Sequence, residues 1–156
     1  MVDEGGHNFK RLRDKILARS QAQDWDLAKK EWKLVGIYEA DEPDTCLCGH
    51  TPIIEVCVLA NTLNGSRVEV GNRCVKRFLG LRSDLIFAGL KRIREDSSKS
   101  LNADATVFFY EKGVITPWEY KFQSDTMLKR VLSGKQLQTR QNINRKVLDH
   151  LSRRGI

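Results

Sequence analysis

Hydrophobic residues recur at helical spacing at the start of the chain and throughout its second half. Between Asn8 and Ser20 they fall three or four positions apart, which predicts an amphipathic helix with a basic opposite face. Asp24 is suited to cap a second helix that runs to about Glu31. Further helices that form a bundle are predicted to begin at Ser83, Asn102, Thr116 and Ser133.

The middle of the chain has shorter, alternating patterns that are typical of strands. Trp32–Tyr38 predicts a short strand, and a turn-rich loop follows at residues 39–45. Pro52–Asn61 and Arg67–Val70 predict a hairpin around Asn64-Gly65, because Asn-Gly favours the positive φ angles of a two-residue turn. A helical segment is expected to begin near position 72.

All four cysteines of the chain lie in this middle region, as Cys46, Cys48, Cys57 and Cys74. Zn²⁺ takes four ligands in a tetrahedron, and thiolates are among its best donors. A C-x-C-G turn lets the first two sulfurs face one ion. The predicted hairpin register places Cys57 opposite Asn72, only two positions before Cys74. The sequence therefore predicts one structural zinc ion held by the four cysteines.

His50 is an alternative to Cys57 as the fourth ligand, because it follows Cys48 by two residues. In that arrangement Cys57 is an ordinary buried thiol on a strand. A closed shell of four protein ligands leaves no open position for a reacting water molecule. The sequence also has no metalloprotease, nucleophile-elbow, phosphate-loop or dinucleotide motif. We therefore expect the zinc to be structural and the protein not to be an enzyme.

The segment CLCGH…IEVCVLAN…NG…VEVGNRCVKRFLG resembles a treble-clef-like zinc finger, in which a knuckle, a β-hairpin and a helix deliver the ligands. It is also similar to a module of small bacterial and viral proteins, many of which have no assigned function. The resemblance covers about Trp32 to Leu81. It departs from the usual treble clef in having C-x-C instead of C-x2-C at the knuckle, and one cysteine instead of two at the helix.

The expected fold class is α+β and mainly helical, with a zinc-stapled β-hairpin module of treble-clef-like form packed against a helical bundle. We expect N-terminal helices at 1–31, the zinc module at 32–82 and the bundle at 83–156, all in one compact unit. Six aromatic residues between positions 108 and 122 are expected to fill the core of the bundle rather than to stack on unpaired bases.

Charge changes this picture by pointing to a partner. The formal net charge is +7, from 27 Lys and Arg against 20 Asp and Glu, which favours anionic partners. Residues 129–154 hold eight basic residues against Asp149 alone, and further basic clusters lie on the first helix and beside Cys74. Such clusters suit a phosphate backbone. The candidate contacts are Arg73, Lys76, Arg77, Lys135, Arg140, Arg145 and Lys146.

The sequence thus suggests a non-enzymatic zinc protein that grips the phosphate backbone of DNA or RNA with basic helices. The alternative is a small regulatory module that docks on a larger nucleic-acid-processing enzyme and modulates it. We expect no membrane partner, because no apolar run has the length of a membrane span. The charged N-terminus lacks the features of a secretion signal, which favours a reducing, cytoplasmic location.

Overall fold

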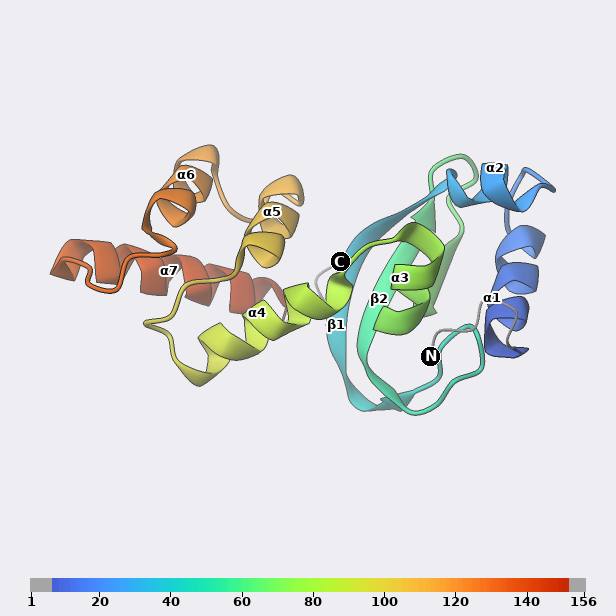
Figure 1. Cartoon of the computed structure of the whole chain (residues 1–156), viewed down its shortest axis with the longest axis horizontal. Coiled ribbons are helices and arrows are strands. Elements are labelled where there is room, and N and C mark those ends of the chain that lie inside the picture. Colours follow the sequence, from blue (N-terminus) through green and yellow to red (C-terminus); the bar gives the residue numbers. More distant parts are fainter. Residues whose placement is uncertain (1–6, 152–156) are drawn as a thin grey trace. The chain divides into compact units, whose positions relative to one another are not determined.

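The computed structural model describes residues 7–151 and has an α+β fold (Figure 1). Within that range it contains seven helices and one antiparallel sheet with the strand order β1-β2-β3. The chain divides into two compact units, the first ending at Ser83 and the second beginning at Asp84. None of the helices in the described range is both long enough and apolar enough to cross a bilayer.

The first unit contains three helices and the whole sheet. Both N-terminal helices are confirmed, and Asp24 caps the second by accepting a hydrogen bond from the Leu27 N–H. Strand β2 is central and pairs antiparallel with both neighbours. The elements are α1 (His7–Ala18), α2 (Trp25–Lys29), β1 (Trp32–Asp44), β2 (Ile53–Asn61), β3 (Arg67–Val70) and α3 (Asn72–Leu79).

Strand β1 is longer than the sequence pattern predicts. Residues 39–44, expected to form a loop, continue the strand, and Glu39 pairs with Glu55 while Asp44 pairs with Ile53. The register shifts between these two pairs, so the intervening residues form an irregularity in the ladder. Because β1 is an edge strand, it can accommodate Pro43, which has no N–H to donate.

The predicted register of the hairpin between β2 and β3 is wrong. Cys57 pairs with Val70, not with Asn72. The loop is wider than a two-residue turn because Asn61 closes it: its side-chain oxygen accepts two loop N–H groups, and its carbonyl accepts the N–H of Gly65. Cys57 therefore lies two strand positions farther from Cys74 than the Asn-Gly signal predicts.

Aromatic contacts join the three helices of the first unit to its sheet. The Trp25 ring stacks on Phe78 of α3 at 5.3 Å between centroids and meets Phe9 of α1 edge-on at 6.1 Å. Trp32 of β1 also belongs to this group, with its ring centroid 6.4 Å from that of Phe78. These contacts fix α1 and α3 within the same folded unit.

A buried carboxylate supports the same arrangement. Glu31 is only 5 % exposed and accepts hydrogen bonds from Asn61 Nδ2 and from the backbone N–H groups of Gln21 and Ala22. The bond from Asn61, followed by the backbone bonds, lowers the pKa of Glu31. Glu31 thereby joins the turn after α1 to the hairpin loop.

The second unit is helical, and three of the four predicted start signals are confirmed as caps; Ser83 is the first residue of its helix, but its hydroxyl donates to Asn72. Asn102 caps its helix, Thr116 and Glu119 form a capping box, and Ser133 exchanges the same pair of hydrogen bonds with Gln136. The helices are α4 (Ser83–Glu95), α5 (Ala103–Glu111), α6 (Pro117–Thr126) and α7 (Gly134–Leu151). Residues 152–154 of the basic C-terminal segment lie outside the described range.

Arg140 of α7, a predicted phosphate contact, is buried instead, and so is its neighbour on the next turn, Asn144. Arg140 is 5 % exposed and donates to the carbonyls of Ser98 and Thr126. Asn144 is 1 % exposed and donates to two more carbonyls of the linker between α4 and α5. That linker has no regular structure, so its buried carbonyls need donors from elsewhere. Arg140 therefore joins α7 to this linker and to the end of α6.

The aromatic residues at 108–122 fill the core of the second unit only in part. Phe109 is fully buried, as expected. Trp118 is 63 % exposed and stacks on Phe122, whereas Tyr110 is 37 % exposed and stacks on Tyr120. The expectation that the whole group is core is wrong, because α5 and α6 each turn one side towards solvent.

The role of Arg140 can be tested by replacement with alanine. Arg140→Ala removes two hydrogen bonds to buried or half-buried carbonyls, and we expect it to lower the free energy of unfolding by about 2–3 kcal/mol. Arg145→Ala removes the same charge from an exposed site on the same helix and should change it by less than about 0.5 kcal/mol. Urea unfolding followed by circular dichroism measures both, and equal effects would contradict the assignment.

Candidate metal centre

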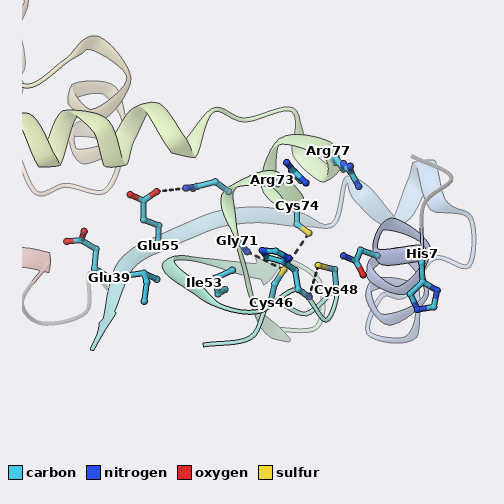
Figure 2. A pocket seen from close by; sticks show the side chains of 14 residues that line it. His7, Glu39, Cys46, Cys48, Ile53, Glu55, Gly71, Arg73, Cys74 and Arg77 are labelled. Atoms are coloured by element: carbon cyan, nitrogen blue, oxygen red, sulfur yellow. Dashed lines mark hydrogen bonds between the residues drawn. The ribbon is translucent and has the colours of Figure 1, made fainter. Parts of the chain in front are cut away.

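Three of the four cysteines come together in the first unit. The Sγ atoms of Cys46, Cys48 and Cys74 all lie within 4.8 Å of one another, and all three residues are buried. The sulfurs of Cys46 and Cys74 are 3.5 Å apart, with Cys48 beside them (Figure 2). A group of thiols this compact could hold a metal ion.

The first two cysteines are positioned by a tight knuckle between β1 and β2. The Gly49 N–H donates to the carbonyl of Cys46 at 2.8 Å, and the Cys46 N–H donates to the carbonyl of His50 at 2.9 Å. Gly49 has a φ of +95°, which L side chains rarely adopt, and a Cβ there would overlap the guanidinium of Arg11. The sequence C-x-C-G therefore folds into a loop that turns both sulfurs to the same side.

The third cysteine comes from the first turn of α3. Gly71 precedes the helix in extended conformation, and its N–H donates to Sγ of Cys46 at 3.3 Å. The N-terminus of a helix carries a partial positive charge, which would help to stabilise a metal-bound thiolate at Cys74. The start of α3 and the knuckle are thus joined directly through sulfur.

The ionisation of these thiols is strongly coupled. The hydrogen bond with Cys74 lowers the pKa of Cys46 to about 5, and the same bond together with burial raises the pKa of Cys74. Burial also raises the pKa of Cys48. Adjacent buried thiols cannot all ionise by themselves, because the thiolates repel one another. A bound cation would remove that repulsion, which is the donor chemistry of a metal centre.

The two predicted candidates for a fourth ligand occupy different places. Cys57 is not part of the sulfur group; it is fully buried, and its Sγ lies 3.5 Å from Oδ1 of Asn72. Burial raises the pKa of Cys57 to about 12. His50 is exposed and lines the same pocket as the three clustered cysteines, and its backbone N–H donates to Sγ of Cys48.

This pocket has a volume of about 760 Å³ and opens beside the sulfur cluster. Glu39 of β1 and Glu55 of β2 lie at one end of it, and Arg73 and Arg77 of α3 lie at the other (Figure 2). The first two residues of α1 also line it. The pocket therefore has an acidic end and a basic end, with the cysteines in its wall.

Asn72 lines the pocket and links several elements around it, and sequence reasoning did not identify it as a site residue. Its Nδ2 donates to Glu55 at 2.6 Å, while its Oδ1 accepts from Ser83 at 2.6 Å and from the Cys57 thiol. The sequence indicates that Asn72 starts a helix. Its three hydrogen-bond partners lie in distant parts of the chain, so local sequence patterns do not reveal them.

The predicted phosphate contacts fall on both units. On α3, Arg73 and Lys76 are exposed and Arg77 is half-buried. On α7, Lys135 and Arg145 are exposed, whereas Lys146 donates to Glu119 at 2.6 Å. All members of the predicted set except Arg77 and Arg140 are therefore exposed, and Lys146 among them is paired with Glu119.

Comparison with protein-family models, with curated proteins and with solved structures gives no match to this chain. The resemblance to treble-clef zinc fingers therefore stays a prediction.

Cobalt(II) is a suitable probe of the sulfur cluster, because thiolate coordination gives it strong near-ultraviolet charge-transfer absorption. We expect this absorption in the wild-type protein and in Cys57→Ser, and its loss in Cys74→Ser. Both variants replace one buried cysteine by serine, so Cys57→Ser is the matched control. Equal absorption from all three proteins would show that Cys74 is not a ligand.

Proposed function

We propose that Cys46, Cys48 and Cys74 hold one structural zinc ion and that His50 is its fourth ligand. Three cysteines and one histidine form a common closed zinc site. The backbone of His50 is already fixed to the knuckle through Cys46 and Cys48, so only its side chain has to turn. Cys57 pairs within the sheet and contacts Asn72, so recruiting it would disturb β2.

Replacing the proposed histidine ligand tests this assignment. We expect His50→Ala to weaken zinc binding by at least about tenfold, since even changes outside the ligand set commonly cost 10–100-fold. His7→Ala is the control, because His7 is also exposed and lines the same pocket. Competition with a chromogenic zinc chelator measures both affinities. Wild-type affinity in His50→Ala would exclude His50 and return Cys57 to consideration.

We further propose that the protein binds the phosphate backbone of DNA or RNA without catalysing a reaction. The observation that carries this proposal is that two basic helices border one pocket. His7 and Asn8 of α1 and Arg73 and Arg77 of α3 all line it. Beyond the pocket, the exposed face of α1 carries several further basic residues, among them Lys10, Arg11 and Lys15.

The charged groups on α3 are available to a ligand. Arg73 and Lys76 are exposed, and within residues 7–151 neither forms an ion pair. Both lie within two positions of Cys74, so a metal at that residue would fix where the charges point. In this proposal zinc positions α3, and α3 contacts phosphates. Lys135 and Arg145 on α7 are proposed as secondary contacts.

Removing two charges from α3 should weaken binding to duplex DNA and reduce its dependence on salt. For Arg73→Ala/Lys76→Ala we expect the log–log salt slope to become shallower by about 2, because each phosphate contact contributes about 0.9. Fluorescence anisotropy over a range of salt concentrations measures this slope.

The matched control is Lys33→Ala/Arg67→Ala. Both residues are exposed and pair with Ala60, which places them on the sheet face opposite to Cys57. It removes the same charge and should leave the slope nearly unchanged. Salt-independent binding, or equal losses in the two double variants, would contradict the proposal. A partner enzyme captured after nuclease treatment would favour the regulatory alternative.

A further inference from the structure

We infer that the pocket beside the sulfur cluster binds the terminal nucleotide of a nucleic acid strand, with a phosphate monoester against Arg73 and Arg77. This inference rests on the proposed nucleic-acid binding and adds to it the part of the ligand that is recognised. It depends on three properties of the pocket, which are its paired guanidinium groups, its separation of charge and its apolar wall.

The basic end of the pocket has donors suited to a phosphate group. Arg73 and Arg77 lie four residues apart, on one side of α3, and both line the pocket. The Nε atom of Arg77 is buried and has no hydrogen-bond partner among the described residues. A buried donor without a partner is unfavourable, and a small turn of the side chain towards the pocket would let an anion accept from it and remove that cost. A guanidinium group can donate two parallel N–H bonds to two oxygens of one phosphate group.

A terminal phosphate matches these two groups better than an internal one. A phosphodiester carries one negative charge, whereas a phosphate monoester near neutral pH carries between about 1.5 and 2. Two guanidinium groups can neutralise the monoester fully. An internal phosphate would also bring its neighbours along the strand, and these would lie near the acidic end of the pocket.

The acidic end excludes a continuous backbone but suits a nucleoside. Figure 2 shows Glu39 and Glu55 at the end of the pocket away from Arg73 and Arg77. Carboxylates repel phosphates and accept hydrogen bonds from N–H and O–H groups. A terminal nucleotide carries its phosphate on one side and the donors of its sugar and base on the other. Its charge distribution is therefore complementary to that of the pocket.

The remaining wall and the size of the pocket agree with this ligand. Ile53 and Ile54 of β2 line it, and Ile54 is 44 % exposed, so an apolar surface is available to a base or sugar. The volume of about 760 Å³ lies within the range of small-molecule sites, roughly 300–1,000 Å³. A concave site of this kind admits the end of a strand, while the basic faces of the helices remain available for internal phosphates.

The test compares three single-stranded oligodeoxythymidines of equal length, with a 5′-phosphate, with a 3′-phosphate or with no terminal phosphate. Each is titrated with the zinc-loaded full chain and followed by fluorescence anisotropy, with an internal fluorophore. We expect at least one phosphorylated strand to bind about tenfold more tightly than the unphosphorylated strand, the effect of one additional charge-assisted contact. The two phosphorylated strands show which end is recognised.

Variants at Arg77 locate the effect. Arg77→Ala and Arg77→Lys should both abolish the preference, and neither should weaken binding of the unphosphorylated strand more than Lys76→Ala does. The lysine variant is included because lysine keeps the charge but cannot offer two parallel N–H groups to one phosphate. Lys76→Ala is the control on the same helix and should weaken all three complexes equally. Zinc content is measured for every variant. If Arg77→Lys lost both its zinc and its preference for phosphorylated strands, the assignment of Arg77 as a phosphate ligand would be overturned, since Arg77 would then act on the metal site.

The remaining outcomes separate this inference from the proposed function. Equal affinity for the three strands would overturn the terminal-nucleotide site and leave backbone binding intact. No measurable affinity for any of the strands, nor for duplex DNA or RNA, would overturn both.

Discussion

Three buried sulfur atoms within 4.8 Å of one another impose the constraint on which the first unit depends. Without a metal, the three thiols cannot all lose their protons. The hydrogen bond between Cys46 and Cys74 lowers the pKa of Cys46 and raises the pKa of Cys74. A bound cation would stabilise the thiolate forms of all three cysteines at once. The sulfurs come from a loop and from the start of a helix, 28 residues apart for Cys46 and Cys74. A short sheet with three helices would gain its definition from such a cross-link.

The same constraint links the structure to the proposed function. Cys74 fixes the first turn of α3, and the residues beside it carry the charge that a phosphate would meet. The aromatic contacts of Trp25 hold α1 against α3, so the two basic helices keep a common arrangement around the pocket. In this account the metal does no chemistry. It sets the positions of the charged side chains in the first turns of α3.

Local signals predicted the structure well where the interactions are themselves local. Asn102, Thr116 and Ser133 cap helices as expected, because each cap bonds within three residues of itself. The C-x-C-G knuckle was predictable for the same reason. The hairpin register was not, because the side chain of Asn61 widens the loop that Asn64-Gly65 alone would close tightly. The sequence shows the turn preference of the Asn-Gly dipeptide, but it does not show that a side chain elsewhere in the loop competes for the same N–H groups.

Long-range polar contacts account for the other differences. Arg140 reaches Ser98, 42 residues away, and so becomes a buried structural residue although its position on α7 suggested an exposed one. Cys57 contacts Asn72 instead of joining the cysteine cluster. Glu39 and Glu55 give the pocket an acidic end, which the positive net charge of the chain does not indicate. Burial of a polar side chain depends on whether distant backbone groups need a partner, which composition does not reveal.

Hydrogen exchange measured with and without a metal chelator tests the central claim most directly, because it reports on both units in one experiment. If the cysteine cluster holds a metal that fixes the first unit, chelation will remove amide protection from the knuckle and from α3, while the amides of α5, α6 and α7 keep theirs. Unchanged protection of α3 in protein shown to be free of metal would contradict the account.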